Sequence, residues 1–257
     1  MIELVLVGAA GRMGRAIEAV AAASDDVRVH GRADLAVMAG GAAAEENWSE
    51  SAEILVRPGD VVIEFSSPAG ARQIAGLCAE RGAPLVSGTT GLSDVDEAAV
   101  RAASARVPVV RAANFSVGVA VLHRALEAAL AVLPADWDVE IIERHHRHKA
   151  DSPSGTALAL AQRIAKRRGV DDRALRAGRS GRSAGRPAGE IGMHSVRGGS
   201  LVGDHTVLLA GEGEWIELRH VAQDRSALAR GALAAARFVA HASPGFYTLE
   251  DVLTGRR

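Results

Sequence analysis

The chain has 257 residues, of which 48% are hydrophobic and 24% charged, which is enough for one large domain or two modest ones. Its formal net charge is −1, so the chain as a whole is not a polyanion binder and any anion site must be a local group of basic residues. Cys78 is the only cysteine, which excludes an intrachain disulfide and fits a reducing compartment. The N-terminus has no secretory pattern and no apolar run reaches the ~18 residues of a membrane span, so we expect a cytoplasmic protein without membrane contacts.

The first half of the sequence alternates between strand and helix patterns. Short apolar runs predict buried strands, and apolar residues at helical spacing predict helices between them. The predicted strands cover residues 2–7, 27–29, 61–65, 85–86 and 107–110, and helices begin near Met13, Pro68 and Ser93. Strands separated by helices in this way favour right-handed crossovers and a parallel sheet, so the fold class is α/β.

A glycine-rich turn joins the first strand to the first helix. Gly8, Gly11 and Gly14 have the spacing G-x-x-G-x-x-G, which lets backbone N–H groups and a helix N-terminus approach a pyrophosphate. Arg12 could add a positive charge to the phosphate. The position between a strand and a helix favours a dinucleotide site over the alternative, a tight turn without a ligand.

Asp34 follows Gly14 by about 20 residues, where an acidic residue accepts hydrogen bonds from the adenosine ribose. Its charge would repel a 2′-phosphate, which would then need a nearby cation that Arg32 could supply. Leu35, not an arginine, follows Asp34. The sequence therefore slightly favours NADH over NADPH, and the alternative is that Asp34 is an ordinary loop carboxylate.

The second half of the sequence has a different pattern. Helices are predicted at 117–132, from Ala157 to about Gly169, and at 226–241, and strands at 139–142, 191–196, 206–210 and 215–220. Gly211-Glu212-Gly213 predicts a hairpin between the last two strands. Residues 166–189 are rich in Arg, Gly and Ser, and we expect a long mobile loop, a lid or an oligomer contact, whose arginines face solvent.

The segment from Glu143 to Thr156, ERHHRHKADSPSGT, carries the most chemistry in the chain. Its histidines and Lys149 can transfer protons and hold anions, and the helix N-terminus with the Ser154 and Thr156 hydroxyls offers a cradle for a carboxylate. A metal site is not expected, because no further Cys or Glu/His cluster completes a tetrahedral ligand set. A generic basic loop would not explain the adjoining Pro-Ser-Gly-Thr turn. The residues indicate an anionic substrate and proton transfer.

This segment resembles the signature of the 4-hydroxy-tetrahydrodipicolinate reductase family, E-x-H-H-x-x-K-x-D-A-P-S-G-T-A, with Ser152 at the usual alanine. Other stretches are similar to the same family, namely residues 8–14, 65–68, 88–91, 113–116, 194–199, 202–206 and 224–232. The resemblance implies NAD(P)H-dependent reduction of a small cyclic dicarboxylate, 4-hydroxy-tetrahydrodipicolinate, in lysine and diaminopimelate biosynthesis.

The resemblance also implies roles for single residues. His145 would be the proton donor and acceptor, with Lys149 as its partner acid. The substrate carboxylates would be bound by His146, Ser154, Gly155 and Thr156. The cofactor would be bound by Gly8, Gly11, Arg12, Met13, Gly14, Asp34, Phe65, Gly88, Thr90, Ala113 and Phe115.

Two domains follow from the resemblance. A Rossmann-type dinucleotide-binding domain would comprise residues 1–113 and 227–257, and an inserted α+β domain, residues 114–226, would bind the substrate and form a homotetramer through an open mixed sheet. Two alternatives remain: another amino-acid dehydrogenase of similar plan, such as an aspartate dehydrogenase, and a non-catalytic dinucleotide sensor. Neither requires the H-H-x-x-K-x-D-x-P-S-G-T run. No basic motif with interleaved aromatic residues suggests a nucleic-acid partner.

Overall fold

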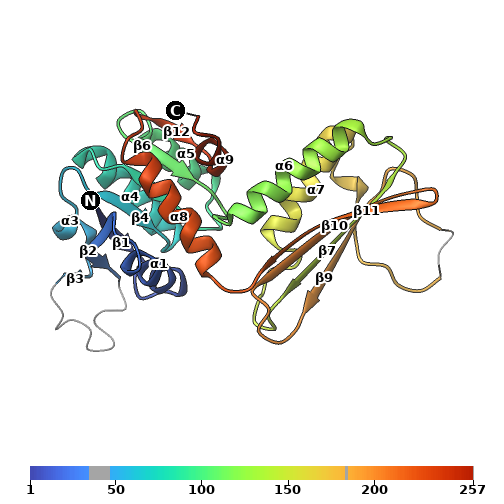
Figure 1. Ribbon diagram of the computed structural model, residues 1–257, viewed down its shortest axis with the longest axis horizontal. Helices are drawn as coiled ribbons and strands as arrows, with labels where there is room; N and C mark the ends of the chain where they lie inside the picture. Colours follow the sequence, from blue (N-terminus) through green and yellow to red (C-terminus); the bar gives the residue numbers. More distant parts are fainter. Residues whose placement is uncertain (35–46, 183–184, 257) are drawn as a thin grey trace. The chain divides into compact units, whose positions relative to one another are not determined.

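The computed structural model describes residues 1–34, 47–182 and 185–256. The chain forms two compact units, one of Met1–Val117 with Arg225–Arg257 and one of Gly118–Asp224 (Figure 1). Within the described residues, no helix is long and apolar enough to cross a membrane.

A seven-stranded sheet forms the centre of the first unit, in the order β12-β6-β5-β4-β1-β2-β3, and all its pairs are parallel. The strands are β1 (Ile2–Val7), β2 (Val27–Ala33), β3 (Trp48–Ser49), β4 (Val61–Glu64), β5 (Leu85–Ser87), β6 (Pro108–Arg111) and β12 (Gly245–Tyr247). Leu4 and Val62 are fully buried, as expected for central strands of a parallel sheet with covered faces. The sheet confirms the predicted Rossmann-type architecture.

Helices pack in pairs against this sheet, α1 with α8 and α4 with α5 (Figure 1). The helices of this unit are α1 (Arg12–Ala22), α3 (Ala52–Leu55), α4 (Pro68–Arg81), α5 (Asp94–Ala103), α8 (Ser226–Val239) and α9 (Leu249–Thr254). Ser93 caps α5 through a capping box with Asp96, and Gly82 ends α4 in the left-handed conformation with φ 68°. The cap at Ser93 confirms the predicted start of α5.

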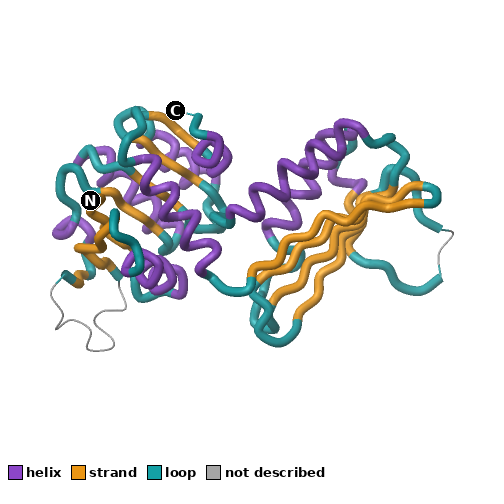
Figure 2. The backbone as a smooth tube through the Cα atoms, in the orientation of Figure 1, coloured by secondary structure: helices purple, strands orange, loops and turns teal. Residues whose placement is uncertain are grey.

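The second unit has a five-stranded mixed sheet in the order β11-β10-β7-β9-β8, with two helices on one side (Figure 2). Its elements are α6 (Val117–Val132), β7 (Asp138–His145), α7 (Gly155–Arg168), β8 (Leu175–Ala177), β9 (Ile191–Arg197), β10 (Gly203–Gly211) and β11 (Glu214–Ala222). β7 runs parallel to β9 and antiparallel to β10, and β10 and β11 form the predicted hairpin. This sheet confirms the expected open mixed sheet.

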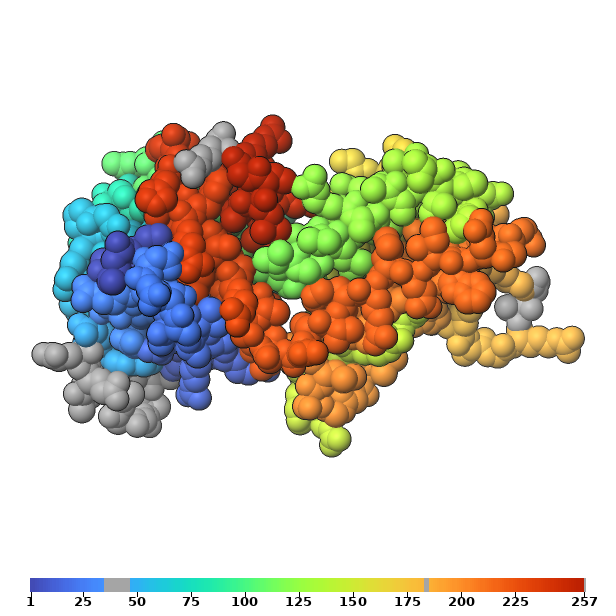
Figure 3. All heavy atoms as spheres, in the orientation of Figure 1, coloured from blue at the N-terminus to red at the C-terminus, as the bar shows by residue number. Residues whose placement is uncertain are grey.

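Alternate residues of β7 point to the helix-covered face of this sheet. Val139 and Ile141 pack there with Leu126 of α6 and Leu160 of α7 in one buried core. On the other face, Trp215 is 68% exposed. The region of β10 and β11, orange in Figure 3, lies on the visible surface of this unit.

The prediction of one long loop at residues 166–189 is wrong at residues 166–168 and 172–177, whereas residues 178–182 and 185–189 form neither helix nor strand and Arg173, Arg176 and Arg182 are exposed as expected. Helix α7 continues to Arg168, and residues 172–177 form a short 3-10 helix and then β8, which pairs with β9. Arg186 donates to Asp138 at 2.7 Å and to Glu140 at 3.0 Å, and Arg179 pairs with Glu140 at 3.2 Å. These two arginines face carboxylates of β7, the central strand of the sheet. Residues 183–184 lie outside the described residues.

Candidate functional site

The glycine turn after β1 is closely packed. Gly8 has φ +79°, and a Cβ on it would overlap the carbonyl group of Phe65. A Cβ on Gly14 would overlap the backbone of Ala9, so this glycine lets α1 approach β1. This close packing requires glycine at both positions, as the G-x-x-G-x-x-G spacing predicts.

The N-terminus of α1 is suited to an anion. Gly11 is its N-cap, and within the described residues no side chain caps this helix and no acidic residue lies in its first turn. Most of the other α-helices in the described residues are capped by a Ser or Thr side chain, as α4 is by Ser67. Backbone N–H groups at such an end can bind a phosphate. Arg12 is exposed beside them and Met13 is half-buried, so these residues fit a dinucleotide pyrophosphate.

Phe65 directly follows β4, and its ring packs against the loops that follow β5 and β6. Its ring lies 5.5 Å from that of Phe115 in an edge-on arrangement, and a Cβ on Gly88 would overlap it. Thr90 and Ala113 are exposed on the same loops after β5 and β6. These residues therefore lie at the carboxyl edge of the parallel sheet, where open α/β sheets bind ligands.

Asp34 lies at the end of β2, beside the glycine turn. Its Oδ2 accepts a hydrogen bond from the backbone N–H of Ala10 at 2.9 Å. Arg32 donates from Nε to Glu18 Oε1 at 2.7 Å, so the cation that the sequence offers for a 2′-phosphate is already paired. Leu35 lies outside the described residues.

Arg225, at the N-terminus of α8, adds a basic residue beyond those predicted for the cofactor site. It precedes α8, and its pKa is lowered first by burial and then by the positive charge of Arg12. Two guanidinium groups therefore interact near the N-terminus of α1, which concentrates positive charge there.

In the second unit, His145 is held by a buried carboxylate. Glu143 and His145 are alternate residues of β7, so both point to the helix-covered face, and they are 1% and 7% exposed. His145 Nδ1 lies 2.5 Å from Glu143 Oε2. Arg197, at the end of β9, donates to both Glu143 oxygens at 2.7 and 2.8 Å. Strand β7 thus extends to His145, whereas the sequence predicted that the strand ends at residue 142 and that a polar segment follows it.

The charges of this cluster shift each pKa in a defined direction. Burial alone would raise the pKa of Glu143, but hydrogen bonds from Arg197 and His145 lower it to about 2. Burial lowers the pKa of His145, the hydrogen bond to Glu143 opposes this, and the charges of Lys149 and Arg197 lower it further. Glu143 is therefore an anion at neutral pH that both orients His145 and stabilises its protonated form.

The N-terminus of α7 adjoins this cluster. Ser154 is its N-cap, and the Ser154 hydroxyl accepts a hydrogen bond from the Ala157 N–H at 3.2 Å. The Ser154 N–H donates to Glu143 at 3.2 Å, which ties the helix end to the carboxylate. Gly155 is exposed and Thr156 half-buried in the first turn. The Ser154 hydroxyl is thus the cap of this helix, and a contact between Ser154 and the substrate remains a prediction.

His205 of β10 lies against both groups. Its ring is 5.0 Å from that of His145, and its Nε2 lies 3.1 Å from the Ser154 hydroxyl. Burial, followed by the charge of His145, lowers the pKa of His205 to about 4. A neutral imidazole therefore forms one wall of the cluster at neutral pH.

Lys149 and His146 lie on the segment that follows β7. Lys149 Nζ donates to Asp151 Oδ1 at 2.7 Å, and its charge reaches His145. His146 is half-buried, and its ring lies 6.4 Å from that of His148. Within the described residues, no group of three or more His, Cys, Asp or Glu side chains could hold a metal ion.

The residues predicted from the sequence do not include Arg197 or His205. Glu143 stands in the signature segment, but no role was predicted for it. Glu143 could have been found, because it stands two residues before His145 and a strand places such residues on one face. Arg197 lies 54 residues away from Glu143 in sequence, and only strand pairing of β7 with β9 brings them together.

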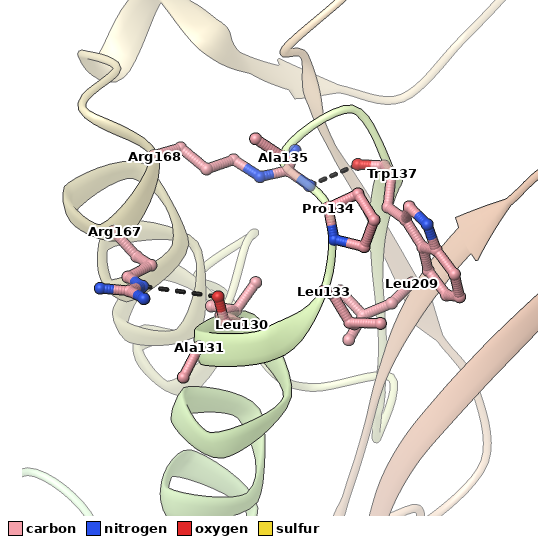
Figure 4. A pocket seen from close by; sticks show the side chains of 9 residues that line it. All are labelled: Leu130, Ala131, Leu133, Pro134, Ala135, Trp137, Arg167, Arg168 and Leu209. Atoms are coloured by element: carbon pink, nitrogen blue, oxygen red, sulfur yellow. Dashed lines mark hydrogen bonds between the residues drawn. The ribbon is translucent and has the colours of Figure 1, made fainter.

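A cavity of about 250 Å³ lies elsewhere in the second unit, between the ends of α6 and α7 (Figure 4). Trp137 and Leu209 line it, and Arg168 donates to the Trp137 carbonyl (Figure 4). None of the predicted site residues lines this cavity.

Comparison with known proteins identifies the family. The description "Dihydrodipicolinate reductase, N-terminus" matches residues 2–115, and "Dihydrodipicolinate reductase, C-terminus" matches residues 118–253. A 4-hydroxy-tetrahydrodipicolinate reductase of Thermomicrobium roseum is 47% identical over 259 residues, covering 99% of this chain and 100% of its own length. A protein of the same name from Sinorhizobium fredii is 45% identical over 267 residues, covering 98% and 97%.

Solved structures agree with this assignment. A dipicolinate-bound dihydrodipicolinate reductase from Paenisporosarcina sp. TG-14 has a TM-score of 0.78 at 26% identity, covering 98% of this chain and 99% of that one. A probable dehydrogenase from Thermotoga maritima has a TM-score of 0.61 at 13% identity over 98% of this chain and 93% of that one, which shows a shared fold alone. The chain belongs to the dihydrodipicolinate reductase family of oxidoreductases.

Proposed function

We propose that this protein catalyses the NAD(P)H-dependent reduction of 4-hydroxy-tetrahydrodipicolinate in lysine and diaminopimelate biosynthesis. The observation that carries the proposal is the buried Glu143–His145 pair beside the N-terminus of α7. It lies within the part of the chain that matches the family, and a structural neighbour in that family is described as dipicolinate-bound.

In this proposal the first unit binds the dinucleotide, which supplies a hydride when bound. The residues expected to hold it are Gly8, Gly11, Arg12, Met13, Gly14, Asp34, Phe65, Gly88, Thr90, Ala113 and Phe115. NADH is the preferred coenzyme, because the Asp34 carboxylate lies beside the glycine turn and Arg32 is paired with Glu18. A 2′-phosphate would meet negative charge here without a compensating cation from Arg32.

The second unit binds the dicarboxylate and manages the proton. Glu143 accepts from the Nδ1–H of His145, so Nε2 is the atom that exchanges a proton with the substrate. Gly203 leaves space beside this atom, since a Cβ on it would lie only 3.3 Å from His145 Nε2. Lys149 is the partner acid that resupplies the proton, and its positive charge is one of the causes that lower the pKa of His145.

The substrate carboxylates require positive groups. The first turn of α7, with Gly155 and Thr156, presents the positive end of a helix, and His146 lies on the segment before it. The Ser154 cap fixes this turn and connects it to Glu143. The proton donor and one carboxylate subsite are thereby held by a single network.

We also propose a cytoplasmic homotetramer, formed through the open face of the second sheet. Trp215 and Val221 are 68% and 50% exposed there, on one edge strand. Burial of such side chains against another copy is favourable, since apolar area gains about 25 cal/mol per Å² removed from water.

The test replaces His145 by Gln in a coupled assay in which dihydrodipicolinate synthase generates the unstable substrate and NADH oxidation is followed. We expect kcat to fall by ~10²–10⁴-fold, because general acid assistance contributes that range. His148→Gln is the matched control, since His148 is an exposed histidine of the same segment, and it should retain kcat. A folded His145→Gln enzyme with the kcat of the wild type would overturn the proposal.

A further inference from the structure

Glu64 is a buried carboxyl group that the proposed reaction does not use. It is the last residue of β4 and is 0% exposed. Among the residues that the structure describes, no lysine, arginine or histidine pairs with it. Burial of a carboxylate is costly unless hydrogen bonds satisfy its oxygens, so its neighbours have to supply donors.

The donors are one backbone N–H and three hydroxyl groups. The N–H and the hydroxyl of Ser66 each lie 2.7 Å from Glu64 Oε1, and the Thr89 hydroxyl also donates to Oε1. The Ser87 hydroxyl donates to Oε2 at 3.1 Å. Both oxygens of the carboxyl group are therefore engaged by neutral donors in fixed positions.

Two of these donor residues lie in the loops that follow β4 and β5, and Ser87 is the last residue of β5. Ser66 lies in the first loop and Thr89 in the second, and the Ser66 N–H is also 2.8 Å from the Thr89 hydroxyl oxygen. The Gly88 N–H donates to the Glu64 carbonyl at 2.9 Å. Glu64 thus connects both loops through its side chain and its backbone carbonyl.

The same loops carry Phe65, Gly88 and Thr90, which are proposed to contact the dinucleotide. They have little room to move, since a Cβ on Gly88 would overlap the Phe65 ring and one on Gly70 would overlap the Ser66 hydroxyl. Loss of the carboxyl contacts would therefore displace the loops together.

We propose that Glu64 is a positioning residue for the dinucleotide, which clamps the loops after β4 and β5 in the arrangement that binds the cofactor. This inference rests on the proposed function, because it takes the loops at Phe65 and Gly88 as cofactor contacts. Glu64 itself touches neither cofactor nor substrate, and it acts on the affinity for the dinucleotide through Ser66, Ser87 and Thr89.

A purely structural carboxyl group offers the contrast. Asp60 immediately precedes β4, at the strand end opposite Glu64, and is 5% exposed. It accepts from the Arg57 N–H at 2.7 Å and pairs with His30 at 2.9 Å. Asp60→Asn should lower stability but leave cofactor affinity unchanged, so it is a control for general damage to the unit.

The experiment measures the Kd of NADH for the full chain by calorimetry, with thermal unfolding in parallel. Glu64→Gln keeps the shape of the side chain but provides one acceptor oxygen in place of two, and we expect Kd to rise about tenfold. Thr89→Val, which removes one donor, should raise Kd in the same direction by less. Asp60→Asn should keep Kd within about twofold. Amide hydrogen exchange at Ser66 should accelerate in Glu64→Gln without any ligand.

A further variant separates failure of this inference from failure of the proposed function. Gly88→Ala forces its Cβ against the Phe65 ring and should weaken NADH binding if this loop contacts the cofactor. Unchanged Kd in Gly88→Ala would remove the loop from the cofactor site and overturn both proposals. A weakened Gly88→Ala together with an unchanged Kd in Glu64→Gln and Thr89→Val would overturn the role of Glu64 alone.

Discussion

Glu64 and Glu143 are both buried carboxyl groups near strand ends, one in each unit, but their partners differ. Glu64 is held by hydroxyl and N–H donors that carry no charge. Glu143 is held by the Arg197 guanidinium and by an imidazole that can take up a proton. Neutral donors fix the position of loops, whereas the charged and titratable partners of Glu143 also set the protonation of a side chain. The first arrangement suits cofactor binding and the second suits proton transfer.

The largest effect should come from neutralising Glu143. Glu143→Gln removes the anion that orients His145 and balances Arg197, so kcat should fall by at least ~10²-fold while dipicolinate still binds. Steady-state kinetics and calorimetry with dipicolinate measure the two quantities.

Glu140→Gln is the matched control for this variant. Glu140 is on the same strand, points to the opposite face of the sheet and also contacts basic side chains, those of Arg179, Arg186 and His194. We expect its kcat to stay within about threefold of the wild type, because it does not contact His145. Equal losses in both variants would show that general damage to the sheet, not loss of the Glu143–His145 pair, lowers kcat.

The next effect concerns the stability of the second unit in acid. The pKa of His205 is lowered to about 4 from 6.5, so between these values the unfolded chain binds more protons than the folded one. Stability is therefore present above pH 6.5 and is lost as pH falls towards 4, with about 3 kcal/mol corresponding to the full shift. Urea unfolding at pH 7 and pH 4.5 should show a smaller loss in His205→Gln than in the wild type. Parallel losses in the two proteins would show that His205 is not the group that titrates.

The smallest effect should be on coenzyme choice. Asp34→Ala removes the carboxylate beside the glycine turn, so kcat/KM with NADH should fall by roughly tenfold as the ribose contact is lost. The value with NADPH should fall less or rise, because repulsion of the 2′-phosphate is relieved. Steady-state kinetics with each coenzyme check this, and an unchanged ratio between the two would show that Asp34 does not discriminate.

Much of the fold could be predicted because its signals are local. Apolar runs predict β1 and β4, and Ser93, Pro68 and Gly82 define helix ends through contacts within a few residues. The short strands β3, β8 and β12 escaped prediction because none of them contains consecutive aliphatic residues, as the equally short β5 does. Their existence depends on pairing with strands far away in the sequence.

The candidate site shows the same division. The glycine turn and the segment from His145 to Thr156 are continuous in sequence, so their composition alone indicates a dinucleotide and an anionic substrate. Arg197 and His205 join the site only through the pairing of β9 and β10 with β7. Partners at such separation have no local pattern, so only the three-dimensional structure brings Arg197 and His205 to Glu143.

The most direct test of the central claim is the coupled assay on the wild-type protein, with NADH and NADPH compared at several concentrations. We predict rapid coenzyme oxidation that depends on the substrate supplied by the synthase, with the higher kcat/KM for NADH. A folded protein that binds the coenzyme but oxidises none when the substrate is present would contradict the account. That result would favour another dehydrogenase activity or a dinucleotide sensor.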